Sequence, residues 1–423
     1  MCRSVPQMPV SATSTVTSPG PGRGSSAGPT RTDPGSVMTA ARMGDRLQSQ
    51  AAVGLDIHLS AWWTNCPFSR KVRVMEAVVY TGPGELSVAD RPAPRPGPGE
   101  VVVDVSHVGI CGSDLLIWAG GLDRVRPPVV LGHEFSGVVT DPNGCPGVAA
   151  GDRVVVEPLL ACGECGACQA GQRHVCRRLR LIGIDVDGAA AAYVAVPAAR
   201  LHRVPDRLSL RDAALAEPTA VAVHMVRRAG VGVADRVLVV GGGPIGALVA
   251  AVCRVAGAAT LVVSEPNTYR REFLADLGFC THDPAAQPGG ADLAALAGGD
   301  GDGRDAAGRA VDGFDVAFEL TGVPAGLAAA VGATATHGTV LLGGLPHGPV
   351  PVQVAEAVFK ELSLVGSRVY TSADMADAVG LIASGAVPAG RLVTREVALP
   401  DAVDGAYESL RAGRDDMKIL ITP

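Results

Sequence analysis

Aromatic residues and lysine are both scarce in this chain. Phe, Trp and Tyr make up 4% of its 423 residues, so its core must be built from Val, Leu, Ile and Ala. Lysine occurs only at Lys71, Lys360 and Lys418, and the formal net charge at pH 7 is −6. A chain with this charge presents no electrostatic footprint for nucleic acid or an anionic membrane. We therefore expect a small-molecule ligand, with neither nucleic acid nor membrane as a partner.

Long unbroken apolar runs are also lacking. The uncharged run 237–253 is at the short end for a membrane span and contains the sequence GGGP. The run 320–355 is longer, but Gly, Pro, Thr and His interrupt it throughout. Neither run predicts a transmembrane helix, and the N-terminus lacks the apolar region of a secretory signal. We expect a cytoplasmic protein.

The length exceeds one ordinary core and predicts two domains after an atypical start. Residues 1–74 are rich in Ser, Thr, Gly and Pro, which predicts a disordered extension or a start codon assigned too early. An organellar transit peptide is an alternative, because the segment has Arg-rich, acid-poor stretches. From Met75, Val-rich runs alternate with Gly and Pro turns, which is typical of a β-rich unit. From about Asp235, strands alternate with helices, which predicts a parallel, doubly wound α/β sheet.

Four cysteines lie within fifteen residues, at Cys162, Cys165, Cys168 and Cys176. The Gly and Ala residues between them let the backbone curl so that all four sulfurs converge. Four thiolates around a tetrahedral ion make a closed site, so the spacing predicts a structural zinc. A pair of disulfides is the alternative, which the compact spacing and the lack of a secretory signal disfavour.

A glycine fingerprint follows the apolar run RVLVV. Gly241 permits a tight turn, Gly243 lets a pyrophosphate approach the backbone, and Gly246 lets helix and strand pack closely. Pro244 and Ile245 open the next helix, whose N-terminal N–H groups favour phosphate. A tight turn without ligand is the alternative.

An acidic residue stands about twenty residues further on, as nucleotide-binding units require. Glu265 ends the second strand, where a carboxylate binds the ribose diol and repels a 2′-phosphate. The sequence therefore predicts NAD over NADP. Arg270 and Arg271 lie nearby and favour the opposite preference, because arginine accepts a 2′-phosphate.

A second set of metal-ligand types is spread along the chain. Cys111 lies in GICGSD, His133 and Glu134 lie in LGHEFSG, and Glu217 lies in LAEPTAV. A thiolate, an imidazole and a carboxylate can hold zinc with one position open for a substrate oxygen. Each residue alone has a plainer reading, as a core thiol, a core histidine or a surface acid.

These motifs bring a resemblance. Residues 75–423 resemble the zinc-dependent medium-chain alcohol dehydrogenases, because GICGSD, GHEFSG, the four-cysteine loop, AEP and GGGPIG occur in that family's order and spacing. Within the family the chain looks like the polyol and secondary-alcohol branch of sorbitol (L-iditol), butanediol and threonine dehydrogenases. Glu217 falls where ethanol-active members carry a second cysteine ligand. Whether Glu134 or Glu217 holds the metal at rest stays open.

The resemblance also implies an architecture. A GroES-like catalytic domain is expected over 75–225, completed by 367–423, with a Rossmann domain over 226–366. Two zinc ions per chain, NAD, and a homodimer or homotetramer are implied, with the segment 338–346 as a pairing strand.

Residue roles follow from the resemblance as well. Ser113 matches the hydroxyl that accepts the alcohol proton, and Leu116 replaces a histidine of the usual outer relay. Asp114 is expected to orient the metal ligands. Lys418 matches a basic position near the cofactor pyrophosphate, although a solvated terminal lysine is the alternative.

The function that the resemblance implies is a zinc-dependent oxidoreductase that transfers a hydride between a secondary alcohol or polyol, or its ketone, and NAD. Several alternatives remain beside it. A threonine 3-dehydrogenase or an aminosugar or cyclitol dehydrogenase fits the same motifs. A metal-free NADPH-dependent enone or quinone reductase lacks the metal-ligand set, and a non-enzymatic nucleotide-binding protein does not need it.

Overall fold

The computed structural model describes residues 74–286, 290–298, 311–346, 348–413 and 415–423. The predicted N-terminal extension lies outside the described residues, apart from Val74, which already begins a strand. Within the described ranges, we find no helix with the length and apolar character that a membrane span needs.

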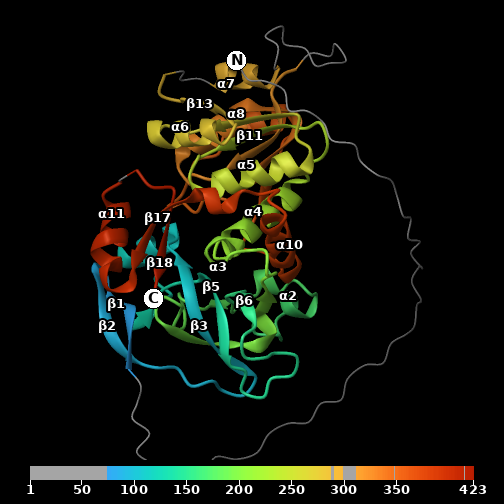
Figure 1. The fold of residues 1–423 in the computed structure, drawn as a ribbon. Coiled ribbons are helices and arrows are strands. Elements are labelled where there is room, and N and C mark those ends of the chain that lie inside the picture. Colours follow the sequence, from blue (N-terminus) through green and yellow to red (C-terminus); the bar gives the residue numbers. More distant parts are fainter. Residues whose placement is uncertain (1–73, 287–289, 299–310, 347, 414) are drawn as a thin grey trace, which may run out of the picture. The chain divides into compact units, whose positions relative to one another are not determined.

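The two larger sheets of the β-rich part (Figure 1) form where Val residues cluster, because β-branched side chains pack well on a pleated surface. The three-stranded sheet has the order β2-β1-β4 and comprises β1 (Val74–Gly82), β2 (Glu85–Pro92) and β4 (Val129–Val130). The seven-stranded sheet has the order β10-β6-β5-β3-β18-β17, with β9 also paired to β3. Its strands are β3 (Glu100–Gly109), β5 (Glu134–Asp141), β6 (Arg153–Val156), β9 (Tyr193–Pro197), β10 (Leu201–Arg203), β17 (Val393–Ala398) and β18 (Lys418–Thr422).

The C-terminal segment therefore shares a sheet with strands from early in the chain. Strand β18 runs antiparallel to β3, with Leu420 opposite Gly109, and parallel to β17. This pairing brings the last residues of the chain beside the end of β3, where Cys111 follows.

A six-stranded parallel sheet follows, in the order β13-β12-β11-β14-β15-β16. The chain starts in the middle, runs to one edge and returns to the other, which is the doubly wound arrangement, so the predicted fold class is confirmed. The central strands β11 and β14 are almost entirely buried. The strands are β11 (Arg236–Val240), β12 (Thr260–Ser264), β13 (Cys280–His282), β14 (Phe314–Glu319), β15 (Thr334–Leu342) and β16 (Ser363–Gly366).

One expectation about this sheet is wrong. The segment 338–346 was expected to pair with a second copy, but β15, which contains its first residues, already has β14 and β16 as neighbours. An interior strand has no free hydrogen-bonding edge. Among the described strands, β16 and β13 are the edges.

Three helices pack together beside this sheet: α4 (Ala216–Ala229), α5 (Pro244–Ala256) and α10 (Ser372–Ala383). The predicted domain boundary at 225/226 falls inside α4.

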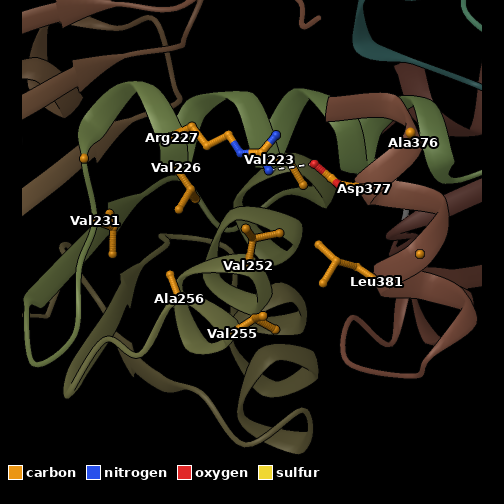
Figure 2. A pocket seen from close by; sticks show the side chains of 12 residues that line it. Val223, Val226, Arg227, Val231, Val252, Val255, Ala256, Ala376, Asp377 and Leu381 are labelled. Carbon is orange, nitrogen blue, oxygen red and sulfur yellow. Dashed lines mark hydrogen bonds and ion pairs between the residues drawn. The ribbon is translucent and has the colours of Figure 1, made fainter. Parts of the chain in front are cut away.

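A cavity of about 590 Å³ lies between the three helices (Figure 2). Valine, alanine and leucine line most of it, with the Arg227–Asp377 ion pair among them. None of the predicted site residues lines this cavity.

The remaining elements are short. The helices are α1 (Gly112–Trp118), α2 (Gly166–Gln169), α3 (Leu210–Ala213), α6 (Thr268–Asp276), α7 (Gly290–Ala295), α8 (Pro324–Ala333), α9 (Val354–Phe359) and α11 (Glu408–Arg411). Two further strands, β7 (Leu159–Leu160) and β8 (Arg180–Leu181), pair in a sheet of their own. The short 3-10 helices are η1 (Arg173–Val175), η2 (Ala198–Arg200), η3 (Leu296–Gly298), η4 (Ala389–Leu392) and η5 (Leu399–Asp401), and η6 (Val403–Tyr407) is a turn of π-helix.

Candidate metal and nucleotide sites

Three side chains of different chemistry converge beside the end of β3 and the start of β5. One ligand-type atom from each of Cys111, His133 and Glu134 lies within 4.8 Å of the other two. Strand pairing explains the convergence, because Glu134 begins β5 directly opposite Gly109 at the end of β3. Any side chain at Gly109 would collide with the carboxylate of Glu134. A thiolate, an imidazole and a carboxylate so close together fit a zinc ion.

Asp114 contacts two of these residues, Cys111 and His133. It is fully buried, and its Oδ2 accepts a hydrogen bond from the backbone N–H of Cys111 at 2.9 Å. Its Oδ1 lies 3.5 Å from Nδ1 of His133. Burial alone lowers the pKa of His133, but Asp114 and Cys111 raise it well above its ordinary value. A carboxylate at Nδ1 orients the ring with Nε2 toward the open side, where Ser113 Oγ lies 3.4 Å away.

Lys418 lies at this cluster too. Its ammonium group forms an ion pair with Glu134 and donates a hydrogen bond to the carbonyl of Ile110 at 2.8 Å. Burial lowers the pKa of Lys418, and Glu134 more than compensates, so the pKa is raised. Because Lys418 is only 3% exposed, the alternative of a solvated terminal lysine is wrong. Its role toward a pyrophosphate stays a prediction.

Glu217 is buried in the first turn of α4 but does not belong to the group of three. Burial raises its pKa to about 7, while His133 lowers it and Glu134 raises it further, so the carboxyl group lies near both. Tyr370, which is completely buried, lies close enough that it and Glu217 shift each other's pKa. Sequence reasoning missed Tyr370, because it follows β16 in a loop with no motif around it.

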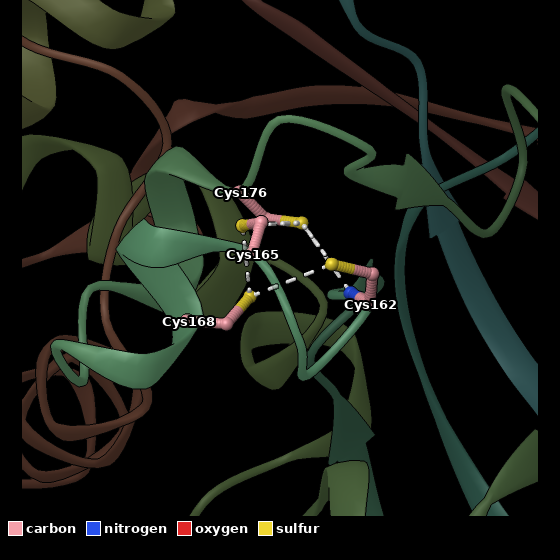
Figure 3. A group of neighbouring side chains, drawn as sticks. All are labelled: Cys162, Cys165, Cys168 and Cys176. Carbon is pink, nitrogen blue, oxygen red and sulfur yellow. Dashed lines mark hydrogen bonds between the residues drawn. The ribbon is translucent and has the colours of Figure 1, made fainter. Parts of the chain in front are cut away.

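The four predicted cysteines of the compact loop come together (Figure 3), and all are free thiols, so the disulfide alternative is wrong. Their sulfur atoms lie 3.4 Å (Cys162–Cys176), 3.6 Å (Cys165–Cys168) and 3.9 Å (Cys162–Cys168 and Cys165–Cys176) apart. A tetrahedron with zinc–sulfur bonds of about 2.3 Å has edges of about 3.8 Å. The four thiols therefore fit one zinc ion.

The glycine fingerprint forms the predicted turn between β11 and α5. Gly241 has φ +106°, a left-handed conformation that favours glycine. A side chain at Gly246 would collide with the carbonyl oxygen of Gly241. At Gly243, an added Cβ would meet only Arg270 Nη1 at 3.7 Å, so open space remains above the backbone. Pro244 begins α5, where its missing N–H costs nothing.

Glu265 contacts this turn directly. Its Oε2 accepts a hydrogen bond from the backbone N–H of Gly242 at 2.7 Å, and its Oε1 accepts one from Asn267 at 2.9 Å. Sequence reasoning passed over Gly242, although a Cβ there would lie 2.9 Å from Cβ of Glu265. Arg271 forms an ion pair with Asp283 at 2.8 Å, whereas Arg270 faces Gly243.

A buried carboxylate at the end of β14 was also missed. Glu319 Oε1 accepts hydrogen bonds from the backbone N–H groups of Thr321 at 2.8 Å and Gly322 at 3.0 Å. A Cβ at Gly241 would lie 3.0 Å from Thr321 Cγ2, so this loop borders the glycine turn. In doubly wound sheets, a ligand binds where these two central strands end.

Two family models match the chain. The alcohol dehydrogenase GroES-like domain matches residues 97–206, which include the cluster of three and the four-cysteine loop. The zinc-binding dehydrogenase model matches residues 244–384.

The chain matches two named relatives over nearly their whole length. The chain is 38% identical over 349 residues to a 2-dehydro-3-deoxy-L-galactonate 5-dehydrogenase of Pseudoalteromonas atlantica, which covers 82% of this chain and 98% of the relative. It is 35% identical over 357 residues to an L-threonine 3-dehydrogenase of Pyrococcus horikoshii, covering 80% and 96%. Among solved structures, a zinc-binding dehydrogenase from Sinorhizobium meliloti bound to NADP superposes with a TM-score of 0.75 at 32% identity, covering 83% of this chain and 100% of that one.

Proposed function

Because the chain belongs to the zinc-dependent medium-chain alcohol dehydrogenases, in their polyol and secondary-alcohol branch, we propose that it moves a hydride between a secondary alcohol or polyol and NAD. The observation that carries this proposal is the convergence of Cys111, His133 and Glu134 beside Ser113. The residues needed to bind zinc and to receive a proton therefore meet in one place.

Two zinc ions per chain fit the donor sets. Cys111 and His133, with Glu134 or Glu217, would hold the catalytic ion, and the four cysteines of the loop would hold the structural ion. A bound catalytic zinc would supply Lewis acidity, which lowers the pKa of an oxygen ligand such as water or an alcohol far below its ordinary value. The closed four-sulfur set leaves no position for substrate, so it serves stability.

The chain's own residues handle the proton and the charges. Ser113 Oγ accepts the alcohol proton, and Asp114 holds His133 in the orientation that keeps Nε2 on the substrate side. Lys418 neutralises Glu134 within the protein interior. Leu116 cannot transfer a proton, so Ser113 would release its own hydroxyl proton to water or, with NAD bound, to the cofactor ribose.

We propose NAD as the cofactor. Gly241, Gly243 and the start of α5 would bind the pyrophosphate, with Arg270 facing that space. Glu265 supports the choice of NAD, because a carboxylate at this point binds the ribose diol and repels a 2′-phosphate. Because a similar structure contains NADP, the preference of this chain for NAD over NADP needs a direct measurement.

The substrate class is tested by a screen of vicinal diols, alditols, cyclitols, aminosugars, sugar acids and threonine, with NADH formation as the signal. Activity on at least one secondary alcohol, lost after chelation and restored by zinc, supports the proposal. Threonine oxidation would select the alternative for which one relative is named. Zinc-independent reduction of enones by NADPH would contradict the proposal.

We also propose that the protein is cytoplasmic, because thiols stay reduced there. We further propose a homodimer formed through the β16 edge and helix α9. Val354, Val358 and Phe359 on α9 are 64%, 64% and 85% exposed, an unusual group for a free surface. Sedimentation should show a dimer, and Phe359→Asp should shift it toward monomer.

A further inference from the structure

His174 lies inside the four-cysteine loop without being one of its sulfur ligands. It is in η1, between Cys168 and Cys176. Its ring packs edge to face against the ring of His224 in α4, with 4.9 Å between ring centroids and 70° between planes. Its Nδ1 is buried and has no hydrogen-bond partner in the part of the chain that the structure describes. The loop therefore meets α4 through this ring.

His224 in turn contacts a third element, helix α10. Its Nδ1 lies 2.9 Å from Oδ2 of Asp374, which is buried in the first turn of α10. The same carboxylate accepts hydrogen bonds from the backbone N–H of Thr371 at 2.8 Å and from its hydroxyl at 2.7 Å, closing a capping box. Arg227, also in α4, donates to Oδ1 at 2.6 Å. Asp374 thus ties α4 to the start of α10.

The two elements that Asp374 links, helix α4 and the Thr371 cap of α10, both lie next to the proposed catalytic site. Glu217 lies on α4 about two helical turns before His224, so the two side chains leave the helix on the same side. Tyr370 directly precedes Thr371 and lies close to Glu217. A shift of α4 against the Thr371 cap would therefore move Glu217 relative to Tyr370 and to the cluster of three.

We propose that His174 is a positioning residue for Glu217. Through His224 and Asp374, the four-cysteine loop fixes α4 against the cap of α10, and this fixes the carboxylate of Glu217 near His133 and Glu134. The inference rests on the proposed zinc-dependent dehydrogenase function. It gives the structural metal loop a second role, because order in the loop then determines the geometry of a group in the catalytic site.

The test compares His174→Ala with His174→Phe, which keeps an aromatic ring for the edge-to-face contact. His174→Ala should lower kcat by about tenfold, the lower end of what loss of an outer partner of a metal site costs, with KM for NAD unchanged. His174→Phe should recover most of that loss. His337→Ala is the matched control, since that histidine side chain is 71% exposed, and it should leave kcat unchanged.

A double variant separates positioning from general stability. If His174 acts through Glu217, His174→Ala should cause no further loss in a Glu217→Gln background. The affinity of the weaker zinc equivalent, measured by competition with a chromophoric chelator, should follow the same pattern and does not depend on turnover. Full loss in both backgrounds, or unchanged kcat and zinc affinity in His174→Ala, would overturn the proposal.

Two further outcomes are covered by this design. If the wild type oxidises no alcohol, the proposed function fails, while the zinc affinities still decide the role of His174. If His174→Ala loses zinc from the four-cysteine loop, Asp374→Asn interrupts the same contacts outside the loop. The zinc affinity of Asp374→Asn, measured with and without Glu217→Gln, then decides whether these contacts act through Glu217.

Discussion

Lys418, five residues before Pro423, forms a buried ion pair with Glu134, the neighbour of the candidate ligand His133. The two side chains are 4% and 1% exposed, so neither charge is compensated by water. The pairing of β18 with β3 carries the lysine to this place. Strand β18 thus supplies the positive charge that balances Glu134, in a site whose other residues lie far earlier in the sequence.

Lys418→Met should therefore destabilise the fold by about 3–5 kcal/mol, because it leaves the carboxylate of Glu134 buried without a partner. Denaturant unfolding of protein loaded with zinc measures the loss. Adding Glu134→Gln to Lys418→Met should restore part of the stability, since the buried charge is then gone. Equal stability of the wild type and Lys418→Met would show that the pair contributes nothing.

Glu265→Gln should shift the cofactor preference toward NADP. The amide keeps an oxygen that can accept the N–H of Gly242 but no longer repels a 2′-phosphate. Glu265→Ala removes that hydrogen bond as well and should weaken NAD by roughly 10- to 100-fold. Fluorescence titrations with NADH and NADPH measure both effects. A wild type that already prefers NADPH would contradict our interpretation of Glu265.

Ser113→Ala should bind zinc and NAD as the wild type does but oxidise alcohol about 10²- to 10⁴-fold more slowly, the usual contribution of a positioned proton acceptor. The defect should be greatest at low pH, where hydroxide cannot replace the acceptor. Ser113→Thr keeps the hydroxyl and is the control. A pH–rate profile decides, and a uniform loss at every pH would argue for a merely steric role.

The candidate ligands were predictable because each lies in a contiguous motif whose residue types already specify the chemistry. The same holds for the glycine turn, where local backbone geometry demands Gly241 and Gly246. Tyr370 was not predictable, because its proximity to Glu217 depends on how two separate segments pack. The position of β15 inside its sheet was missed for a similar reason, since an apolar strand has the same pattern at an edge and in the interior.

Asp374→Asn should lower the stability at neutral pH by about 1–3 kcal/mol, through loss of a helix cap and of charged hydrogen bonds. Burial raises the pKa of Asp374, but hydrogen bonds from His224, Thr371 and Arg227 hold it well below its ordinary value. A lowered folded-state pKa stabilises the protein above the unfolded-state pKa, and this contribution is lost as the pH falls. The difference between wild type and variant should narrow as the pH falls from about 5 toward 3.

The two metal sites should respond oppositely to removal of one thiol. Cys165→Ser opens the closed four-sulfur set, and structural zinc in small peptides contributes roughly 10–16 kcal/mol, so the variant should melt much earlier. Each folded molecule should lose no more turnover than the roughly tenfold expected of His174→Ala, because the four cysteines do not touch the substrate. Cys111→Ser removes a ligand beside a β-sheet with its own core, so it should lose turnover and one zinc equivalent but keep its melting temperature.

Cys145→Ser is the control, because that thiol is buried in the core and belongs to neither metal group. It should keep both zinc equivalents and full turnover. Melting curves, zinc content and turnover of the three variants are measured side by side. A stable, inactive Cys165→Ser together with an unfolded Cys111→Ser would reverse the assignment of structural and catalytic sites, and the proposed proton transfer to Ser113 would fail with it, because Ser113 lies beside Cys111 and His133.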